Sequence, residues 1–209
     1  MRIRSRLSSI IAVLSLCMLG MGQAAGQSGC RSGGNAAANA YVHMNPIYAV
    51  FYGSLQDYVR QHRALFTAGS DAVRCLAALS RAAMSAAVQV YDPADVRRRD
   101  EMNARLGAMG ISPGPPQQTA SGNLYTMSIQ LARLARTLPA AANGDFGPYY
   151  TPTNDMERLQ IFAERMFPQM MQDPTLRAVI AQHESLIKQA AQAEFQMVLH
   201  AAQRLSNAE

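Results

Sequence analysis

The sequence predicts an all-α protein, an antiparallel helical bundle of about four longer helices with shorter helical pieces between them. Apolar residues recur every three or four positions in successive segments, which is the period of an amphipathic helix. No segment shows the two-residue alternation of a strand between hairpin turns. Three segments also begin with Asn or Asp followed by proline, a strong helix start.

The stretch from Asp173 to Asn207 is the longest predicted helix. Asp173 can cap it, and Pro174 suits the first turn because its fixed φ is helical and its missing N–H is not needed there. The helix would be about 50 Å long and could not be stable alone, so we expect its apolar stripe to be buried and the helix to form the spine of the bundle. The stripe consists of Leu176, Ile180, His183, Ile187, Ala191, Phe195, Val198, Ala202 and Leu205.

The other helices follow from the same signals. Asn154 and Glu157 resemble a capping box, and Pro168 should kink or end the helix that they open. Two long loops, rich in Gly and Pro, separate the later helices. The predicted helices cover residues 46–66, 71–91, 93–106, 123–138, 154–170 and 174–207, and the long loops cover residues 107–119 and 139–153.

The N-terminus has the features of a secretory signal peptide over residues 1–26. Arg2, Arg4 and Arg6 precede an apolar run of about 15 residues, which is shorter than the roughly 20 that a membrane span needs. Small residues follow, and we expect cleavage before Gln27, with cleavage after Ala24 as the second choice. The mature chain is therefore predicted to be exported to the periplasm or secreted. The alternative is a retained anchor helix.

The composition changes again after the signal. Residues 27–44 are rich in Gly, Ser, Asn and Ala, which predicts a flexible linker. Residues 45–207 then suit a single helical-bundle domain with one core.

The charge of the whole chain overstates its basic character. The 19 Lys and Arg against 14 Asp and Glu become 16 against 14 once the three signal arginines are removed, so the net charge falls from +5 to +2. The run Arg97-Arg98-Arg99 is surrounded by Asp95, Asp100 and Glu101, which favours a solvated helix face. With no stripe of basic and aromatic residues, we expect no nucleic-acid partner.

Two cysteines remain outside the signal. In an oxidising compartment Cys30 and Cys75 predict a disulfide, which could contribute on the order of 4 kcal/mol by closing its loop. The alternative takes Gln27-Ser-Gly-Cys30 as a lipoprotein box, with the following tract as a tether. A lipidated Cys30 would anchor the chain to the membrane and leave Cys75 as a free thiol.

The catalytic motifs are incomplete. Gly110 to Gly114 fits the G-x-S-x-G pattern around Ser112, but Pro113 has no N–H for the oxyanion hole, so a hydrolase built on Ser112 is only a distant hypothesis. His183-Glu184 begins an H-E-x-x-H zinc motif that fails at Ile187. His183 also falls on the apolar stripe, which favours a core histidine. We therefore expect no enzymatic activity.

The loop before residue 154 is the candidate binding element. Phe146, Tyr149 and Tyr150 lie between prolines, and aromatic loop residues make rigid, amphipathic contacts with partners. The alternative is that these rings fold back over the end of the bundle. The leading hypothesis is an exported, non-enzymatic protein that binds another envelope or secreted protein.

A different hypothesis is a periplasmic bundle that binds haem or Cu(I). Thioethers bind Cu(I), and Met with His can ligate haem inside a bundle. Methionine also fills irregular gaps in cores, which is the interpretation that we favour, so no cofactor is expected. The candidate ligands are His62, His183, Met166, Met170 and Met171.

Overall fold

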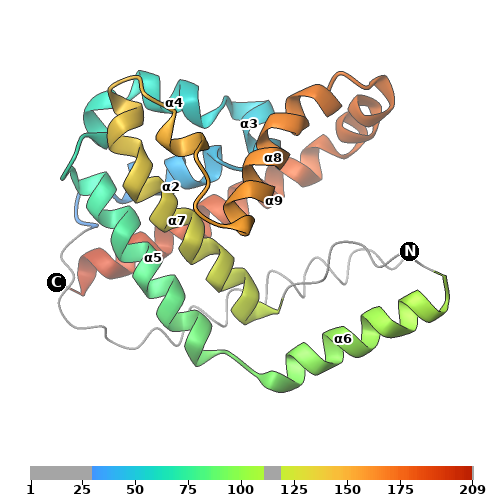
Figure 1. The fold of residues 1–209 in the computed structure, drawn as a ribbon. Coiled ribbons are helices and arrows are strands. Elements are labelled where there is room, and N and C mark those ends of the chain that lie inside the picture. The colour runs from blue at the N-terminus through green and yellow to red at the C-terminus, as the bar shows by residue number, and fades with distance from the viewer. Residues whose placement is uncertain (1–29, 111–118, 209) are drawn as a thin grey trace. The chain divides into compact units, whose positions relative to one another are not determined.

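The computed structural model describes residues 30–110 and 119–208 and confirms the all-α prediction (Figure 1). Within these ranges every regular element is a helix, and the packing is that of a helical bundle. The elements are α2 (Gly34–His43), α3 (Pro46–Tyr52), α4 (Leu55–Gln61), η2 (Arg63–Phe66), α5 (Asp71–Gln89), α6 (Pro93–Ala108), α7 (Ala120–Ala142), η3 (Pro148–Tyr150), α8 (Asp155–Met170) and α9 (Pro174–Asn207).

The helix starts are those that the sequence indicates. The side chains of Asn45, Asp92 and Asp173 each accept a backbone N–H bond in the first turn of the helix that follows, and a proline stands at the next position each time. Asn154 accepts the N–H of Glu157 at 2.9 Å. These caps depend on hydrogen bonds within three residues, so the local sequence determines them.

The single helix predicted for residues 46–66 is wrong, because it is three short pieces. Gly53 has φ 94°, a left-handed conformation that ends α3. Ser54 then caps α4 by accepting the N–H of Asp57 at 3.1 Å. The apolar period continues across the break, and the interruption is signalled only by Gly53-Ser54.

The prediction that Pro139 ends a helix is also wrong. Helix α7 continues through Pro139 to Ala142. Proline in a helix interior loses one backbone hydrogen bond. Here Leu138, Ala141 and Ala142 are all buried around it, and we attribute the continuation to this burial. The following loop is correspondingly shorter than residues 139–153.

The chain divides into two compact units, with boundaries inside α5 and α7. The larger comprises residues 25–80 and 129–209, and the described part of the smaller lies within residues 81–128. This division does not test the prediction of a single folding domain for residues 45–207. Fully buried side chains form the core of the larger unit, namely Val42, Val59, Phe66, Leu76, Leu131, Leu134, Leu138 and Val198.

The flexible linker predicted for residues 27–44 is wrong for its second half, which forms α2. Alanine has the highest helix propensity and no side-chain entropy to lose, so an Ala-rich tract can form a helix once it has a surface to pack on. That surface is provided by α9 and by α3 and α4, all of which contact α2. A Cβ atom at Gly34 would lie 3.2 Å from Ala202 of α9, which measures how closely the two helices approach.

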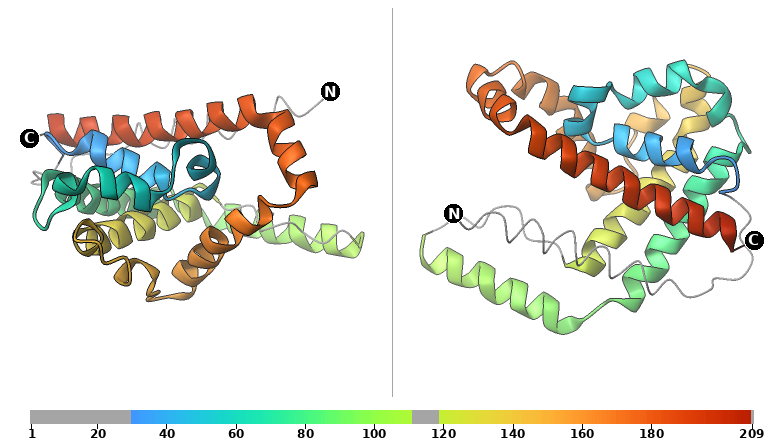
Figure 2. Two further views of the ribbon diagram at one scale, coloured as in Figure 1. Left: turned by 90° about the horizontal axis from the view of Figure 1, so that it is seen from above. Right: turned by 180° about the vertical axis from the view of Figure 1, so that it is seen from behind.

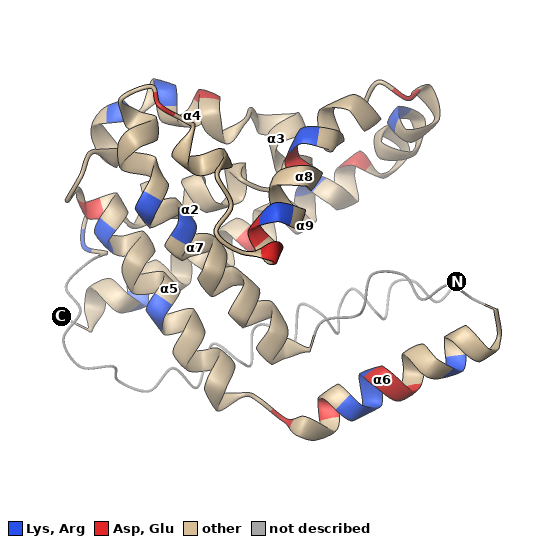
Figure 3. Ribbon diagram, viewed as in Figure 1, with Lys and Arg blue, Asp and Glu red and all other residues tan. Residues whose placement is uncertain are grey.

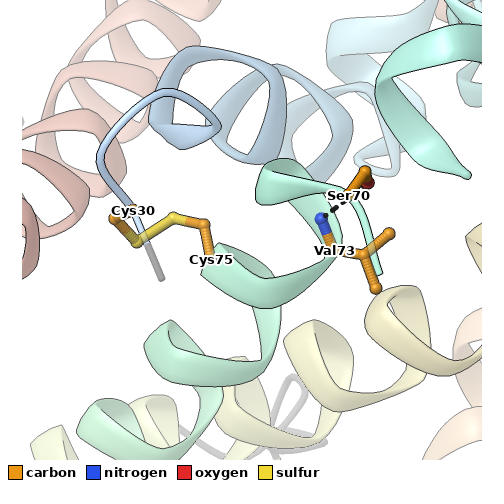
Figure 4. The surroundings of a disulfide bond; sticks show 4 residues. All are labelled: Cys30, Ser70, Val73 and Cys75. Carbon is orange, nitrogen blue, oxygen red and sulfur yellow. Dashed lines mark hydrogen bonds between the residues drawn. A yellow bond between two sulfur atoms is a disulfide. The ribbon is translucent and has the colours of Figure 1, made fainter. Parts of the chain in front are cut away.

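A disulfide joins Cys30, which precedes α2, to Cys75 in α5 (Figure 4). Both cysteines are buried. Ser70, near the start of α5, accepts the N–H of Val73 at 3.4 Å. The disulfide uses the sulfur atom that a lipid would require, so this structure agrees with the disulfide prediction and not with a lipidated Cys30.

Helix α9 has the predicted length, but it is buried along only half of it. Its buried residues are Ala191, Val198, Ala201 and Ala202, and none lies between Pro174 and Ala190. Figure 2 shows α2 lying against the second half of α9, whereas the first half extends beyond it toward the turn to α8. The expectation that the whole apolar stripe is buried is therefore wrong for the first half.

The smaller unit contains the end of α5, α6 and the start of α7. Ala86, Ala87 and Leu124 form its buried cluster, and Ser121 donates a 2.8 Å hydrogen bond to the carbonyl oxygen of Ala87. Helix α6 has no buried residue. Its basic and acidic residues are interspersed (Figure 3), and Arg98 pairs with Asp95, as expected for a solvated helix face.

Ser112 and the predicted signal peptide lie outside the described residues. Within the described ranges, none of the helices combines the length and the hydropathy that a membrane span requires.

Candidate functional site

Exposed apolar side chains occur on α3, on α8 and on the first half of α9, and we call this set of residues the α3–α8–α9 surface. Helix α3 contacts both of the other helices, so the three lie together within the larger unit (Figure 1). Their exposed fractions run from 40% to 65%, far above those of core residues. The surface consists of Ile47, Val50, Tyr52, Leu159, Phe162, Met170, Val179 and Leu186.

The first half of α9 carries an apolar face that the predicted stripe does not include. At 3.6 residues per turn, Val179, His183, Leu186 and Ala190 share one side of the helix. All four are exposed. An amphipathic helix normally gains its stability by burying such a face, so this segment has a face that is suited to a contact but has none in the described chain.

The charged residues of this half-helix lie away from that face. Glu184 and Lys188 form an ion pair with each other, and the Lys188 ammonium lies 5.1 Å from the centre of the Phe51 ring in α3. By helical spacing Arg177 also lies on the side opposite Val179 and Leu186. The exposed apolar face of α9 is therefore free of charge.

A histidine positions α3. The imidazole of His43, which is buried at the end of α2, stacks on the Tyr58 ring with the ring centres 4.6 Å apart. The Tyr48 ring meets it edge-on at 5.0 Å. Its Nδ1 donates a 2.7 Å hydrogen bond to the carbonyl oxygen of Gly53, the residue that ends α3. Burial lowers the pKa of His43, and the nearby His62 lowers it further.

The N-cap of α3 is tied to α9. The Asn45 side-chain amide donates to a Glu194 carboxylate oxygen at 3.4 Å, while its oxygen caps α3. Burial raises the pKa of Glu194, and the hydrogen bond from Asn45 acts in the opposite direction. The α3 part of the surface is thus held at both ends of the helix.

A buried polar network holds α8 against α7. The guanidinium of Arg133, which is fully buried in α7, lies 4.2 Å from the centre of the Tyr149 ring. Its Nη2 donates to Glu164 of α8 at 3.4 Å, and the Tyr149 hydroxyl donates to the same carboxylate at 2.9 Å. Gln160 adds a third donor at 3.0 Å. Three segments therefore meet at one carboxylate.

The network shifts the pKa values of two groups that it contains. Burial raises the pKa of Glu164, with the Arg133 guanidinium opposing the shift. Burial also raises the pKa of Tyr149 well above its ordinary value, and the Glu164 charge adds to this. Because these groups are buried and bonded to one another, we assign the network to positioning α8.

A second carboxylate fixes the start of α8. Glu157 is buried and accepts hydrogen bonds from the backbone N–H and the hydroxyl of Thr153 at 2.6 and 2.8 Å. It also pairs with Arg136 of α7 at 3.2 Å. Burial opposes ionisation of Glu157, but the bonds from Thr153 and Arg136 outweigh it and lower the pKa.

The predicted binding loop is folded inward. Phe146 and Tyr149 are 8% and 2% exposed, so their rings face the interior in this structure. Tyr150 is partly exposed, and the Arg165 guanidinium lies 5.1 Å from its ring centre. This is the alternative arrangement, in which the rings fold back, and the burial of Tyr149 follows from its bond to Glu164.

The candidate cofactor ligands are placed on separate features. His62 ends α4, where its ring lies 4.7 Å from that of Tyr58, and Met166, Met170 and Met171 lie at the end of α8. His183 is exposed and its Nδ1 donates to the Val179 carbonyl at 2.9 Å, so the core-histidine prediction is wrong. Among the described residues, no group of three or more His, Cys, Asp and Glu is placed to hold a metal ion.

The apolar period of the sequence includes five of these eight residues, but it predicts that they are buried; they are Ile47, Val50, Leu159, Phe162 and Met170. The period does not include Tyr52, Val179 or Leu186, and the last two lie beside the main stripe of α9. The available signal was that this helix has apolar residues on two adjacent lines in its first half, more than one packing face requires.

Comparison with known proteins adds no relative to this description: no family model, no curated protein and no solved structure matches the chain.

Proposed function

We propose that the chain is an exported, non-enzymatic helical protein that binds another protein through the exposed apolar face on the first half of α9. The observation that carries the proposal is the first half of α9, which presents an amphipathic helix without a single buried residue. Burying apolar area contributes about 25 cal/mol per Å², so a partner that covers this face stabilises the helix as it binds.

The binding interpretation has further support in the way the surface is held. His43 fixes the end of α3, while Arg133 and Glu164 fix α8. Docking on a preordered surface loses less conformational entropy than docking on a mobile one. The proposal of export rests on the N-terminal residues, and the buried disulfide is compatible with an oxidising compartment.

A photo-cross-linking amino acid at Leu186 tests the proposal in the cells that express the full chain. We expect a defined protein adduct whose partner can be identified by mass spectrometry and which is lost when Val179→Asp is added to the same chain. Val88 is the matched control, because it is 71% exposed but lies on α5, outside the surface. No adduct at Leu186, or the same adducts from Val88, would contradict the proposal.

A further inference from the structure

We propose that α6 is a cleavage site for proteases that cut after arginine, and that the cut chain stays folded as two fragments held together without a covalent link. The site consists of the four arginines of this helix, which are Arg97, Arg98, Arg99 and Arg105. It shares no residue with the exposed apolar face of α9, so it is independent of the proposed binding function.

Helix α6 can open without disturbing a core. A protease binds its substrate as an extended chain, so a helix must unfold locally before it is cut. Most helical stability in proteins comes from burying an apolar face. No residue of α6 is buried, so its opening takes no side chain out of the interior. Among the described helices α3 shares this property, but α3 contains neither Lys nor Arg.

The ion pairs of α6 do little to hold it closed. Arg98 pairs with Asp92 and Asp95, and these three side chains are 40% to 65% exposed. Arg99 pairs with Asp100, the next residue in the chain. Exposed pairs of this kind contribute little to stability because solvent screens them and two long side chains must be ordered. The arginines that a protease would recognise are therefore accessible on a weakly held helix.

The sequence confines such cuts to α6 in this part of the chain. Between Arg81 and Arg133 it has Lys or Arg only within α6, and residues 111–118 have neither. Arg177 is the competing position, because it lies in the half of α9 without a buried residue. That half of α9 contacts α3 through Lys188 and Phe51, so opening it costs a packing contact.

The larger unit is held together across the cut. It comprises residues 25–80 and 129–209, which lie on opposite sides of α6 in the sequence. The Tyr41 hydroxyl donates to Gln130 at 3.0 Å, and the Asn45 amide donates to Glu194 at 3.4 Å. The fully buried core also draws on both sides, with Val42, Val59, Phe66 and Leu76 from before the cut and Leu131, Leu134, Leu138 and Val198 from after it.

The smaller unit is held across the cut in the same way. Ala86 and Ala87, which precede α6, share a buried cluster with Leu124, which follows it. Ser121 donates to the carbonyl oxygen of Ala87 at 2.8 Å. Each unit therefore has its own contacts between the two fragments, and burial of apolar surface keeps them associated.

Hydrolysis breaks the C–N bond after one arginine and adds one water molecule. The arginine gains a carboxyl group, and the next residue gains an amino group. Cys30 and Cys75 both precede α6, so their disulfide lies within the first fragment and does not join the two. Association of the fragments after a cut would therefore be entirely non-covalent.

Limited digestion of the purified full chain with trypsin tests the proposal. We expect the first cut to fall in α6 and to give two fragments whose masses add up to that of the intact chain plus one water. Mass spectrometry in denaturing solvent identifies the fragments without a reductant. Size-exclusion chromatography in native buffer should show them eluting together at the volume of the uncut chain, with the helical circular dichroism signal retained.

Glutamine at all four arginines of α6 should slow the first cut roughly tenfold or more, because cleavage must then wait for a better-packed helix to open. Misfolding would speed cleavage, so it cannot imitate this result. The matched control replaces four exposed arginines of other helical segments with glutamine and should leave the first cut in α6 at its wild-type rate. The control positions are Arg60, Arg63, Arg158 and Arg177.

Three outcomes overturn the proposal. A first cut outside α6, at Arg177 for example, shows that α6 is not the weakest cleavable segment. Equal slowing in the two variants shows that the arginines of α6 have no special role. Fragments that separate in native buffer show that the contacts across the cut do not hold the chain together.

Discussion

The Arg133 guanidinium lies 3.4 Å from the Glu164 carboxylate, and neither group reaches bulk solvent freely: the Arg133 side chain is fully buried and that of Glu164 is 12% exposed. Two further nitrogens of Arg133, Nε and Nη1, have no hydrogen-bond partner within the part of the chain that the structure describes. The carboxylate is thus the main compensation for a buried positive charge. It also accepts the Tyr149 hydroxyl, which links the pair to the aromatic loop.

Glu164→Gln should lower the free energy of unfolding by about 3 kcal/mol, because it leaves the Arg133 charge buried without its partner. Glu184→Gln is the matched control, since Glu184 forms an exposed pair with Lys188 whose loss should cost less than about 0.5 kcal/mol. Chemical denaturation of the two variants measures the difference. Equal effects would show that the Arg133 pair contributes no more than a surface pair.

His43 should make stability depend on pH between its lowered pKa and the ordinary value of 6.5. In that window the unfolded chain binds a proton that the folded chain does not, so the free energy of unfolding rises with pH. Glu164 and Glu194, whose pKa values are raised by burial, contribute slopes of the opposite sign from pH 4.5 upward, because there the folded chain binds protons that the unfolded chain does not.

The His43 contribution is isolated by comparing wild type with His43→Phe, which keeps a ring between Tyr48 and Tyr58 but cannot titrate. Denaturation curves at several pH values should show that the rise below pH 6.5 disappears in the variant. If the same slope persists in His43→Phe, another group is responsible for it.

Gly33→Ala should destabilise the protein. An added Cβ would lie 2.2 Å from the carbonyl carbon of Asp71 in the first turn of α5, where the backbone cannot yield locally. We expect a loss of about 2 kcal/mol or more in thermal or chemical denaturation. Gly107→Ala is the control, because an added Cβ meets nothing within 4 Å and helix propensity should give a gain of about 0.5 to 1 kcal/mol. A neutral Gly33→Ala would contradict the close packing at α5.

The Cys30–Cys75 disulfide and the signal peptide are tested together by the intact mass of the mature protein. We expect a chain that begins at Gln27 and gains two hydrogen atoms on reduction. Replacing both cysteines with alanine should cost about 4 kcal/mol, because the disulfide closes a loop of 45 residues. A mass increased by acyl chains would instead support the lipoprotein alternative.

How far the sequence predicts the fold depends on the range of the interactions involved. Helix starts at Asn45, Asp92, Asn154 and Asp173 could be predicted because a cap is completed within three residues. The continuation through Pro139 could not, because we attribute it to the burial of the residues around it. The break at Gly53 has a local signal in Gly53-Ser54, but the apolar period continues across it.

The sequence by itself determined that this chain is helical, where most of its helices begin, and that Cys30 and Cys75 are the pair available for a disulfide. Only the tertiary structure decided that α2 is buried, that the loop around Tyr149 turns inward and that α9 is covered along only half its length. The physical reason is that burial depends on which distant segments supply the opposing surface. An apolar stripe has the same sequence pattern whether the surface that covers it belongs to the same chain or to another.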